Sequence, residues 1–214
     1  NSPLKKAFPW IDVFMAPSEP APMVDFLLQK EARGLADLET TERFALQDGF
    51  LLPAHEIGRR VTANVPIVLG CSHACAFCII PFRRGAARSR PADEIVREVE
   101  ALVAQGVKEV TLLGQIVDRY GYDLLGDDYK IRTYNPGAAS GNPSQKIAVE
   151  TPMVKLLEKI SAVSGLQRVR FLTSHPNWMT DELLDAVREL PKVMPQIEVP
   201  VQAGDDEILL KMRR

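Results

Sequence analysis

The sequence predicts an α/β protein, a partial TIM-like (βα) barrel with parallel strands, preceded by the remnant of an N-terminal domain. From residue 61 onward, apolar or β-branched segments alternate with helical ones, and such repeats form parallel sheets with right-handed crossovers. Residues 1–58 differ, because prolines interrupt their start and no sharp periodicity follows. We therefore divide the chain into an N-terminal remnant with a linker, 1–58, and a core, 59–214.

The N-terminal remnant holds one short apolar stretch, residues 10–15, between its prolines. Residues 31–50 mix charges with scattered Leu and Ala and end at an Asp48-Gly49 turn signal, which favours a linker that is helical in part. The chain lacks a signal-peptide core and any apolar run of about 18 residues, so we expect a cytoplasmic protein without a membrane partner.

The composition restricts the partners and the redox environment of the protein. A net charge of −2 gives no bulk attraction to nucleic acid, so an RNA partner requires a local basic patch. The three cysteines lie within eight residues, which excludes an intramolecular disulfide framework and indicates thiolates that serve a metal in a reducing compartment.

The first half of the predicted barrel contains two strands and one helix. Residues 61–69 are β-branched and apolar, which is typical of a strand. A helix is expected to begin at Pro91 and to stop at Gly106, because apolar residues recur at helical spacing between them. Residues 109–113 form a strand of the buried type.

The second half repeats the pattern after a long irregular segment. Residues 121–150 are rich in glycine, proline and polar side chains, which indicates either a functional lid or disorder. Thr151 and Thr180 each precede an amphipathic helix, with a third strand at 167–172 between the two helices. A fourth strand is expected at 197–201, and a last helix begins at Asp205 and runs to the chain end, which we interpret as the end of a fragment.

Cys71, Cys75 and Cys78 form a CxxxCxxC loop after the first strand, where a barrel places its active site. Three thiolates can bind three irons of a 4Fe-4S cluster and leave the fourth iron without a protein ligand. An open metal position is what a catalytic centre needs. The alternatives are a structural zinc site with His73 as fourth ligand, whose spacing strains a tetrahedron, and three merely buried thiols.

The motifs around this loop resemble those of the methylthiotransferases in the radical S-adenosylmethionine superfamily, and most closely the MiaB-type tRNA methylthiotransferases. The resemblance covers residues 60–214 well and residues 8–28 weakly. It rests on the cysteine loop and on the following short motifs: Ile79-Ile80-Pro81, Arg84-Gly85, Ser89-Arg90-Pro91, Thr111-Leu112-Leu113-Gly114-Gln115, Tyr120-Gly121, Thr173-Ser174-His175-Pro176 and Val199-Pro200-Val201-Gln202-Ala203-Gly204.

The resemblance implies a radical enzyme that uses a 4Fe-4S cluster and S-adenosylmethionine to add a methylthio group to carbon 2 of N6-isopentenyladenosine in tRNA. Related activities act on threonylcarbamoyladenosine in tRNA or on a ribosomal protein aspartate, and a non-catalytic metal-binding module is the alternative of another class. Implied partners are tRNA, S-adenosylmethionine and an electron donor such as flavodoxin or ferredoxin. The resemblance also implies a second cluster in the full-length protein, held by three further cysteines of the N-terminal domain that this chain does not contain.

The same resemblance assigns roles to individual residues. The three cysteines would bind the cluster, and the residues expected to contact the cofactor are Phe77, Gly114, Gln115, Ser174 and Gln202. Ile116 departs from the pattern, since an Asn is expected after Gly-Gln. Four arginines follow the cluster loop within eight residues and could hold RNA or the cofactor carboxylate, or could pair with nearby acids: Arg83, Arg84, Arg88 and Arg90.

Overall fold

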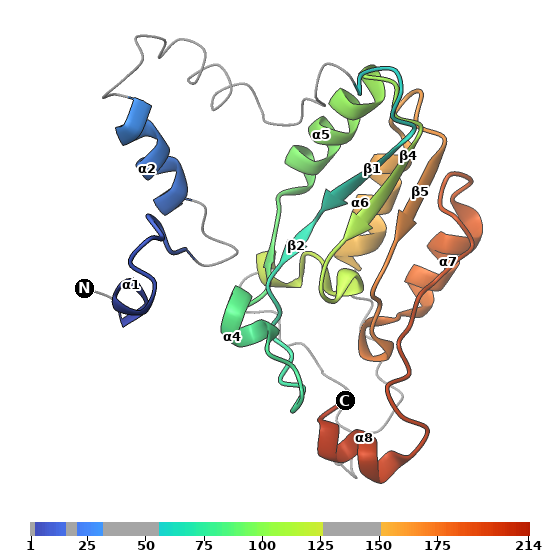
Figure 1. The fold of residues 1–214 in the computed structure, drawn as a ribbon. Helices are drawn as coiled ribbons and strands as arrows, with labels where there is room; N and C mark the ends of the chain where they lie inside the picture. The colour runs from blue at the N-terminus through green and yellow to red at the C-terminus, as the bar shows by residue number, and fades with distance from the viewer. Residues whose placement is uncertain (1–2, 16–20, 32–55, 126–150) are drawn as a thin grey trace.

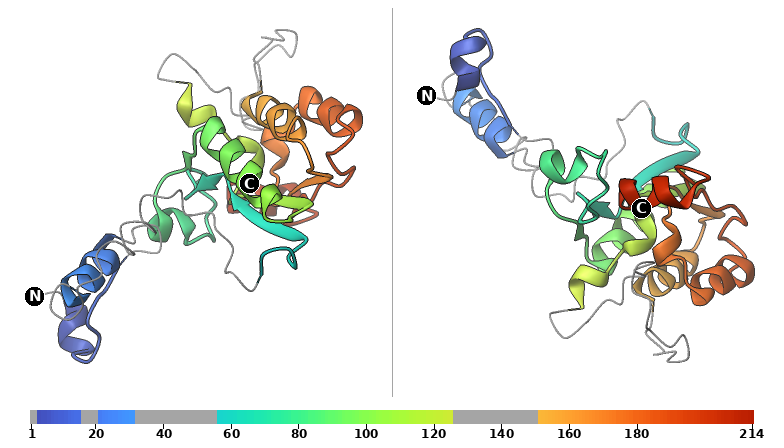
Figure 2. Two further views of the ribbon diagram at one scale, coloured as in Figure 1. Left: turned by 90° about the horizontal axis from the view of Figure 1, so that it is seen from above. Right: turned by 90° about the horizontal axis from the view of Figure 1, so that it is seen from below.

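The computed structural model describes residues 3–15, 21–31, 56–125 and 151–214 (Figure 1). The predicted linker lies almost entirely outside these ranges, as does most of the predicted lid, at 126–150. In the described N-terminal part, helices α1 (Pro3–Ala7) and α2 (Ala21–Glu31) lie apart from the sheet (Figure 2). No helix in the described ranges is both long and apolar enough to cross a membrane.

A three-stranded parallel sheet forms the centre of the core, in the order β1 (Thr62–Pro66), β4 (Glu109–Leu113), β5 (Arg168–Phe171). Side chains alternate across it. Val65, Leu112 and Phe171 share one register row and are buried, whereas the neighbouring residues of β1 are exposed. The parallel β/α arrangement predicted from the sequence is confirmed.

Three amphipathic helices pack in a row against the apolar face of this sheet (Figure 1): α5 (Ala92–Ala104), α6 (Pro152–Ser161) and α7 (Asp181–Glu189). Their buried residues recur at helical spacing, as predicted. The Thr180 hydroxyl caps α7 by accepting from the Leu183 N–H. These helices and the sheet share one hydrophobic core.

The first predicted strand is divided in two. Backbone pairing with β4 ends at Pro66, and β2 (Val68–Leu69) turns away to pair antiparallel with β3 (Arg88–Ser89). Ile67 joins the two parts, since its N–H donates to Leu113 while its carbonyl accepts from Arg90. This short ribbon carries the chain out of the sheet toward the cysteine loop.

The prediction of a fourth strand is wrong, because residues 197–201 form no backbone hydrogen-bond ladder with a neighbouring strand. The preceding chain meets β5 at an isolated parallel bridge between Val169 and Val193 and at a side-chain hydrogen bond from Arg170 to Gln196. The Ser174 N–H donates to the Glu198 carbonyl. Pro195 precedes the segment and Pro200 lies within it, and both lack the N–H group that a ladder requires. The last predicted helix is confirmed as α8 (Asp206–Met212), with the Asp205 carboxylate at its N-cap.

Candidate metal centre

The cysteine loop leaves β2 through a turn that only glycine fits. Gly70 has a φ of 72°, and a Cβ at this position would lie 2.3 Å from the Ala86 carbonyl oxygen. The Cys71 N–H then donates to Gly85, at the end of helix α4 (Ile80–Arg84). The backbone of the loop is thus fixed on both sides of the first cysteine.

The three cysteines line one cavity of about 410 Å³, and all three are free thiols. Cys71 is buried, whereas Cys75 and Cys78 are half-buried. Burial raises the pKa of the Cys71 thiol. Most other lining residues come from the loop and from α4, among them His73, Pro81 and Phe82, and Arg213 reaches the cavity from the end of the chain.

Within the described ranges, no three His, Cys, Asp or Glu side chains form a group that could hold a metal ion. The zinc alternative therefore finds no tetrahedral site here, although His73 Nδ1 lies 3.5 Å from Cys75 Sγ. A cubane cluster spreads its ligands over three separate irons, so thiols placed around a cavity suit it better than they suit one zinc ion.

Cys71 also belongs to a small apolar cluster that joins three loops at the carboxyl ends of the strands. Its other buried members are Ile116, Tyr122 and Trp178. The Tyr122 and Trp178 rings lie 5.0 Å apart. The Ile116 side chain, which stands where the resemblance predicted Asn, therefore packs in the apolar surroundings of a cluster ligand.

The loop after β4 carries Gly114 and Gln115, followed by the 3-10 helix η1 (Val117–Arg119). The Gly114 carbonyl accepts from the Thr173 hydroxyl at 2.6 Å, and a Cβ on Gly114 would lie 3.3 Å from Val68 Cβ. Close packing thus accounts for a glycine at this position, and its contact with the cofactor stays a prediction. Gln115 is half-buried.

The loop after β5 carries Ser174 and His175, which are 2% and 1% exposed. The buried Asp118 carboxylate accepts from the His175 N–H at 2.9 and 3.1 Å, and burial raises the pKa of Asp118 to about 7. Burial also lowers the pKa of His175 to about 4. Neither Ser174 Oγ nor His175 Nε2 has a hydrogen-bond partner among the described residues, so both could serve a bound polar group.

None of the five predicted cofactor residues lines the cavity, and two of them, Phe77 and Gln202, are exposed. Phe77 is 54% exposed and is not among the lining residues, although it lies between two cysteines. Gln202 is exposed and has a φ of 72°. The sequence analysis did not identify Phe82, Asp118 or Trp178 as residues of the site. Their positions shortly after the last cysteine, after β4 and after β5 were the signal that could have identified them.

Residues 65–214 match the model of the Radical SAM superfamily. The chain belongs to the radical SAM superfamily. The superfamily assignment confirms the predicted cofactors, a 4Fe-4S cluster and S-adenosylmethionine, and the three cysteines of the loop are the residues that fit the cluster.

Relatives named tRNA-2-methylthio-N(6)-dimethylallyladenosine synthase match the chain along its whole length. The one from Roseiflexus sp. is 42% identical over 100% of this chain and 38% of its own length. The one from Herpetosiphon aurantiacus is 40% identical over 100% of this chain and 41% of its own length. The chain therefore spans about two fifths of the relatives that it matches. Among solved structures, the radical S-adenosylmethionine methyltransferase TsrM from Kitasatospora setae matches 72% of this chain and 24% of its own, with 18% identity and a TM-score of 0.47.

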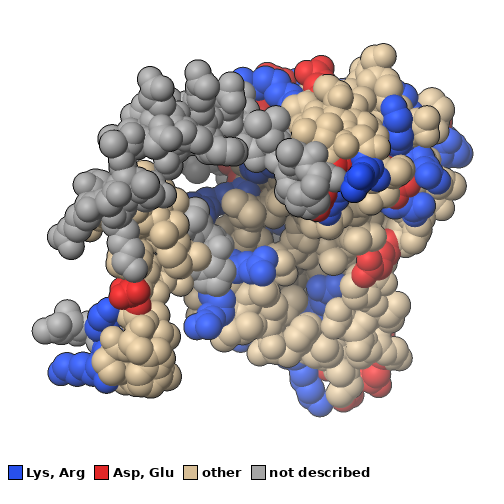
Figure 3. Space-filling view, turned by 45° about the horizontal axis from the view of Figure 1, so that its top comes forward, with Lys and Arg blue, Asp and Glu red and all other residues tan. Residues whose placement is uncertain are grey.

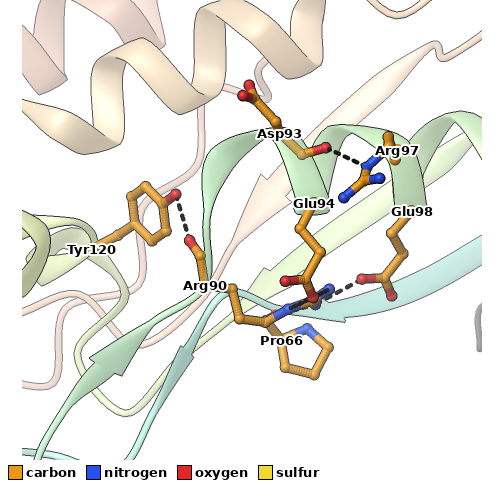
Figure 4. A network of polar contacts seen from close by, with 7 residues as sticks. All are labelled: Pro66, Arg90, Asp93, Glu94, Arg97, Glu98 and Tyr120. Carbon is orange, nitrogen blue, oxygen red and sulfur yellow. Dashed lines mark hydrogen bonds and ion pairs between the residues drawn. The ribbon is translucent and has the colours of Figure 1, made fainter. Parts of the chain in front are cut away.

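One arginine of the predicted ligand patch has a structural role in the radical SAM core (Figure 4). Arg90 donates to Glu94, to the Pro66 carbonyl and to Glu98, whose side chain is 8% exposed. The Tyr120 hydroxyl donates to the Arg90 carbonyl. Arg90 thus joins β1 to α5 and is committed to the nearby acids, whereas Arg83, Arg84 and Arg88 are exposed.

The neighbouring motif residues brace the same region. The Ser89 N–H and hydroxyl donate to the Asp123 carboxylate, at 2.7 and 2.5 Å, and the Ser89 hydroxyl accepts from the Gly121 N–H. A Cβ on Gly121 would lie 2.4 Å from Pro152 Cβ. These motifs of the radical SAM core therefore hold the loop after β4 against β3.

Proposed function

We propose that this chain forms the cluster-binding core of a radical SAM methylthiotransferase that acts on carbon 2 of N6-isopentenyladenosine in tRNA, near the anticodon. The observation that carries the proposal is the placement of Cys71, Cys75 and Cys78 around one cavity, beside the loops that follow β4 and β5. Relatives named for this reaction, matched over the full chain, support the substrate.

Different residues of the site would bind the cluster and the cofactor. The three thiolates would each hold one iron, and the cavity leaves room for a ligand on the fourth. When bound, the cluster supplies the electron for reductive cleavage of S-adenosylmethionine. Ser174 Oγ and His175 Nε2, which are buried without partners, would hydrogen-bond to the bound cofactor or substrate. The backbone at Gly114 and Gln115 would border the methionyl group.

The partners follow from this reaction. Acidic and basic side chains are interspersed on the face shown in Figure 3, so this face as a whole does not attract a polyanion. Binding of the tRNA substrate therefore requires a local group of basic side chains. The exposed Arg83, Arg84 and Arg88 next to the cysteine loop are the residues that we assign to it. A flavodoxin or ferredoxin would supply the electron, and the reaction belongs in the cytoplasm.

We also propose that residues 1–58 are the remnant of a separate N-terminal domain with its linker. No residue of α1 is buried, and Trp10 is 74% exposed. The superfamily match begins only at residue 65. An auxiliary cluster needs further cysteines, and all three of this chain lie in one loop.

Anaerobic reconstitution with iron and sulfide tests the metal centre. The chain should bind about four irons and show broad visible absorption from iron–sulfur charge transfer, and it should make no methylthio product by itself. The Cys78→Ser variant is the matched control and should stay colourless. A colourless, zinc-containing parent chain would overturn the proposal, and about eight irons would contradict a single cluster.

Nucleoside analysis of tRNA tests the substrate. A strain that lacks the full-length gene should lose 2-methylthio-N6-isopentenyladenosine and retain the unmodified isopentenyl nucleoside. The gene on a plasmid should restore the modification, and its Cys78→Ser form should not. Loss of the methylthio group from threonylcarbamoyladenosine instead would reassign the enzyme to the other tRNA substrate.

A further inference from the structure

The Arg119 side chain carries a positive charge that no acid neutralises among the described residues. Its Nε and Nη1 atoms are buried and make no hydrogen bond there. Its guanidinium lies over the Trp178 ring, 5.2 Å from the ring centroid. The neighbouring Asp118 carboxylate is committed to the His175 N–H. The guanidinium is thus held by an aromatic ring and not by a counter-ion.

This charge lies beside the first cluster ligand. Trp178 packs in the same apolar cluster as Cys71, together with Ile116 and Tyr122. The guanidinium covers the Trp178 ring, and Ile116 stands three residues before Arg119 in the chain, so the charge acts on Cys71 across this apolar cluster. Apolar surroundings strengthen such an interaction, because they screen a charge less than water does.

We propose that Arg119 raises the reduction potential of the cluster that Cys71 would bind, by placing an unpaired positive charge next to that ligand. One-electron reduction makes the cluster more negative, and a nearby cation stabilises the reduced form more than the oxidised form. The electron comes from the donor protein in the cell and from a chemical reductant in the test. The inference rests on the proposed function, since it requires the cluster at the three cysteines.

Ile116 also affects the reduction potential expected for this cluster. It stands where the resemblance predicted a polar Asn, and its side chain is 6% exposed. An apolar group at this position keeps water away from Cys71 and disfavours the extra negative charge of the reduced cluster. The Arg119 charge offsets that cost, so this chain combines an apolar neighbour of Cys71 with a half-buried cation.

The test compares midpoint potentials of reconstituted protein, measured by electron paramagnetic resonance at a series of poised potentials. The variants are Arg119→Gln, Arg119→Met and Arg119→Lys, and Arg188→Gln on the exposed face of α7 is the matched control. At the midpoint of the parent, Arg119→Gln and Arg119→Met should show about a tenfold lower ratio of reduced to oxidised cluster, about 59 mV for one electron. Arg119→Lys should keep most of the parent's potential, and Arg188→Gln all of it.

Iron and sulfide are quantified in each variant before titration. An unchanged midpoint in a fully loaded Arg119→Gln or Arg119→Met variant would overturn the inference, as would an equal shift in Arg188→Gln. Loss of iron from both neutral variants but not from Arg119→Lys would also overturn it and would assign Arg119 to cluster assembly. A parent chain that binds no 4Fe-4S cluster would instead refute the proposed function.

Discussion

The imidazole rings of His73 and His175 stack, with their centroids 4.5 Å apart and 30° between their planes. His73 belongs to the cysteine loop, and His175 follows β5, so the stack joins the cysteine loop to the chain that leaves the edge strand β5. Asp118, from the loop after β4, accepts the His175 N–H. Loops that follow three different strands therefore meet at one site.

Replacing any one of the three cysteines with Ala should abolish cluster binding while the sheet and helices stay folded. Cys75→Ala and Cys78→Ala should leave the free energy of unfolding of the apo chain unchanged, because both thiols are half-buried. Cys71→Ala should cost about 1 kcal/mol, because this thiol packs in the apolar cluster with Trp178. Iron content and urea denaturation measure the two effects, and global unfolding of all three variants would show that these residues are structural.

Gly70→Ala should be severely destabilising, by about 3 kcal/mol or more, because the new Cβ would overlap the Ala86 carbonyl. Gly58→Ala is the matched control. It has a φ of 74°, close to the 72° of Gly70, but open space around its Cβ position, so it should cost only about 1–2 kcal/mol. Urea denaturation gives both values. Equal losses in the two variants would mean that backbone strain alone, and not the close contact, decides the cost.

Arg90→Gln should destabilise the chain by about 3 kcal/mol, since it leaves the buried Glu98 carboxylate without its cation. Burial raises the pKa of Glu98, so this carboxylate is costly to leave unpaired. Combining Arg90→Gln with Glu98→Gln should restore much of the loss. Arg188→Gln removes two exposed ion pairs, with Asp185 and Glu189, and should change the free energy of unfolding by less than about 0.5 kcal/mol. A similar small value for Arg90→Gln would show that the network in Figure 4 contributes little.

Asp118 should make the apo chain less stable as the pH rises from about 4 to about 7. Burial raises the pKa of Asp118 from 3.8 to about 7, so the native state keeps a proton that the unfolded state has lost. The unfolded state then binds fewer protons, and the free energy of unfolding falls with rising pH in that window. Hydrogen bonds from the backbone N–H groups of His175 and Asp118 itself, and the Arg214 charge, oppose the effect of burial on this carboxylate.

The Asp118→Asn variant lacks the titrating carboxyl and therefore tests whether Asp118 causes the loss of stability with rising pH. Relative to the parent, the variant should gain roughly 2–4 kcal/mol between pH 4 and pH 8. The pKa of His175, lowered to about 4, gives both proteins the opposite trend below pH 6.5, and it cancels in the comparison. Parallel curves of unfolding free energy against pH for the two proteins would contradict the prediction.

Charge reversal of Arg84 and Arg88 should weaken tRNA binding more than it lowers stability. Exposed charges contribute no more than about 1 kcal/mol to folding. Each phosphate contact that is lost reduces the dependence of binding on salt, so the slope of log K against log salt should become shallower by about 1 per residue. Arg97→Glu on the outer side of α5 is the control. An unchanged slope in the double variant would remove these arginines from the RNA surface.

The sequence by itself determined the parallel β/α architecture and the presence of three cysteines in one loop after the first strand. Helical spacing in α5 and α6 and the apolar run of β4 are local patterns, and local patterns fix secondary structure. The CxxxCxxC spacing likewise predicts a cluster site without any knowledge of the fold, because the three cysteines are close together in the chain. The predicted strand at 197–201 failed because pairing depends on a neighbour's hydrogen bonds, which no local pattern reports.

Only the tertiary structure decided which polar residues serve the site and which serve the fold. Arg90 and Arg88 look alike in the sequence, yet Arg90 is committed to Glu94 and Glu98 while Arg88 is exposed. Arg119 and Trp178 lie almost sixty residues apart, and only folding places the guanidinium over the ring beside Cys71. Burial and counter-ions set the charge of such groups, and both are properties of the folded chain that single residues do not carry.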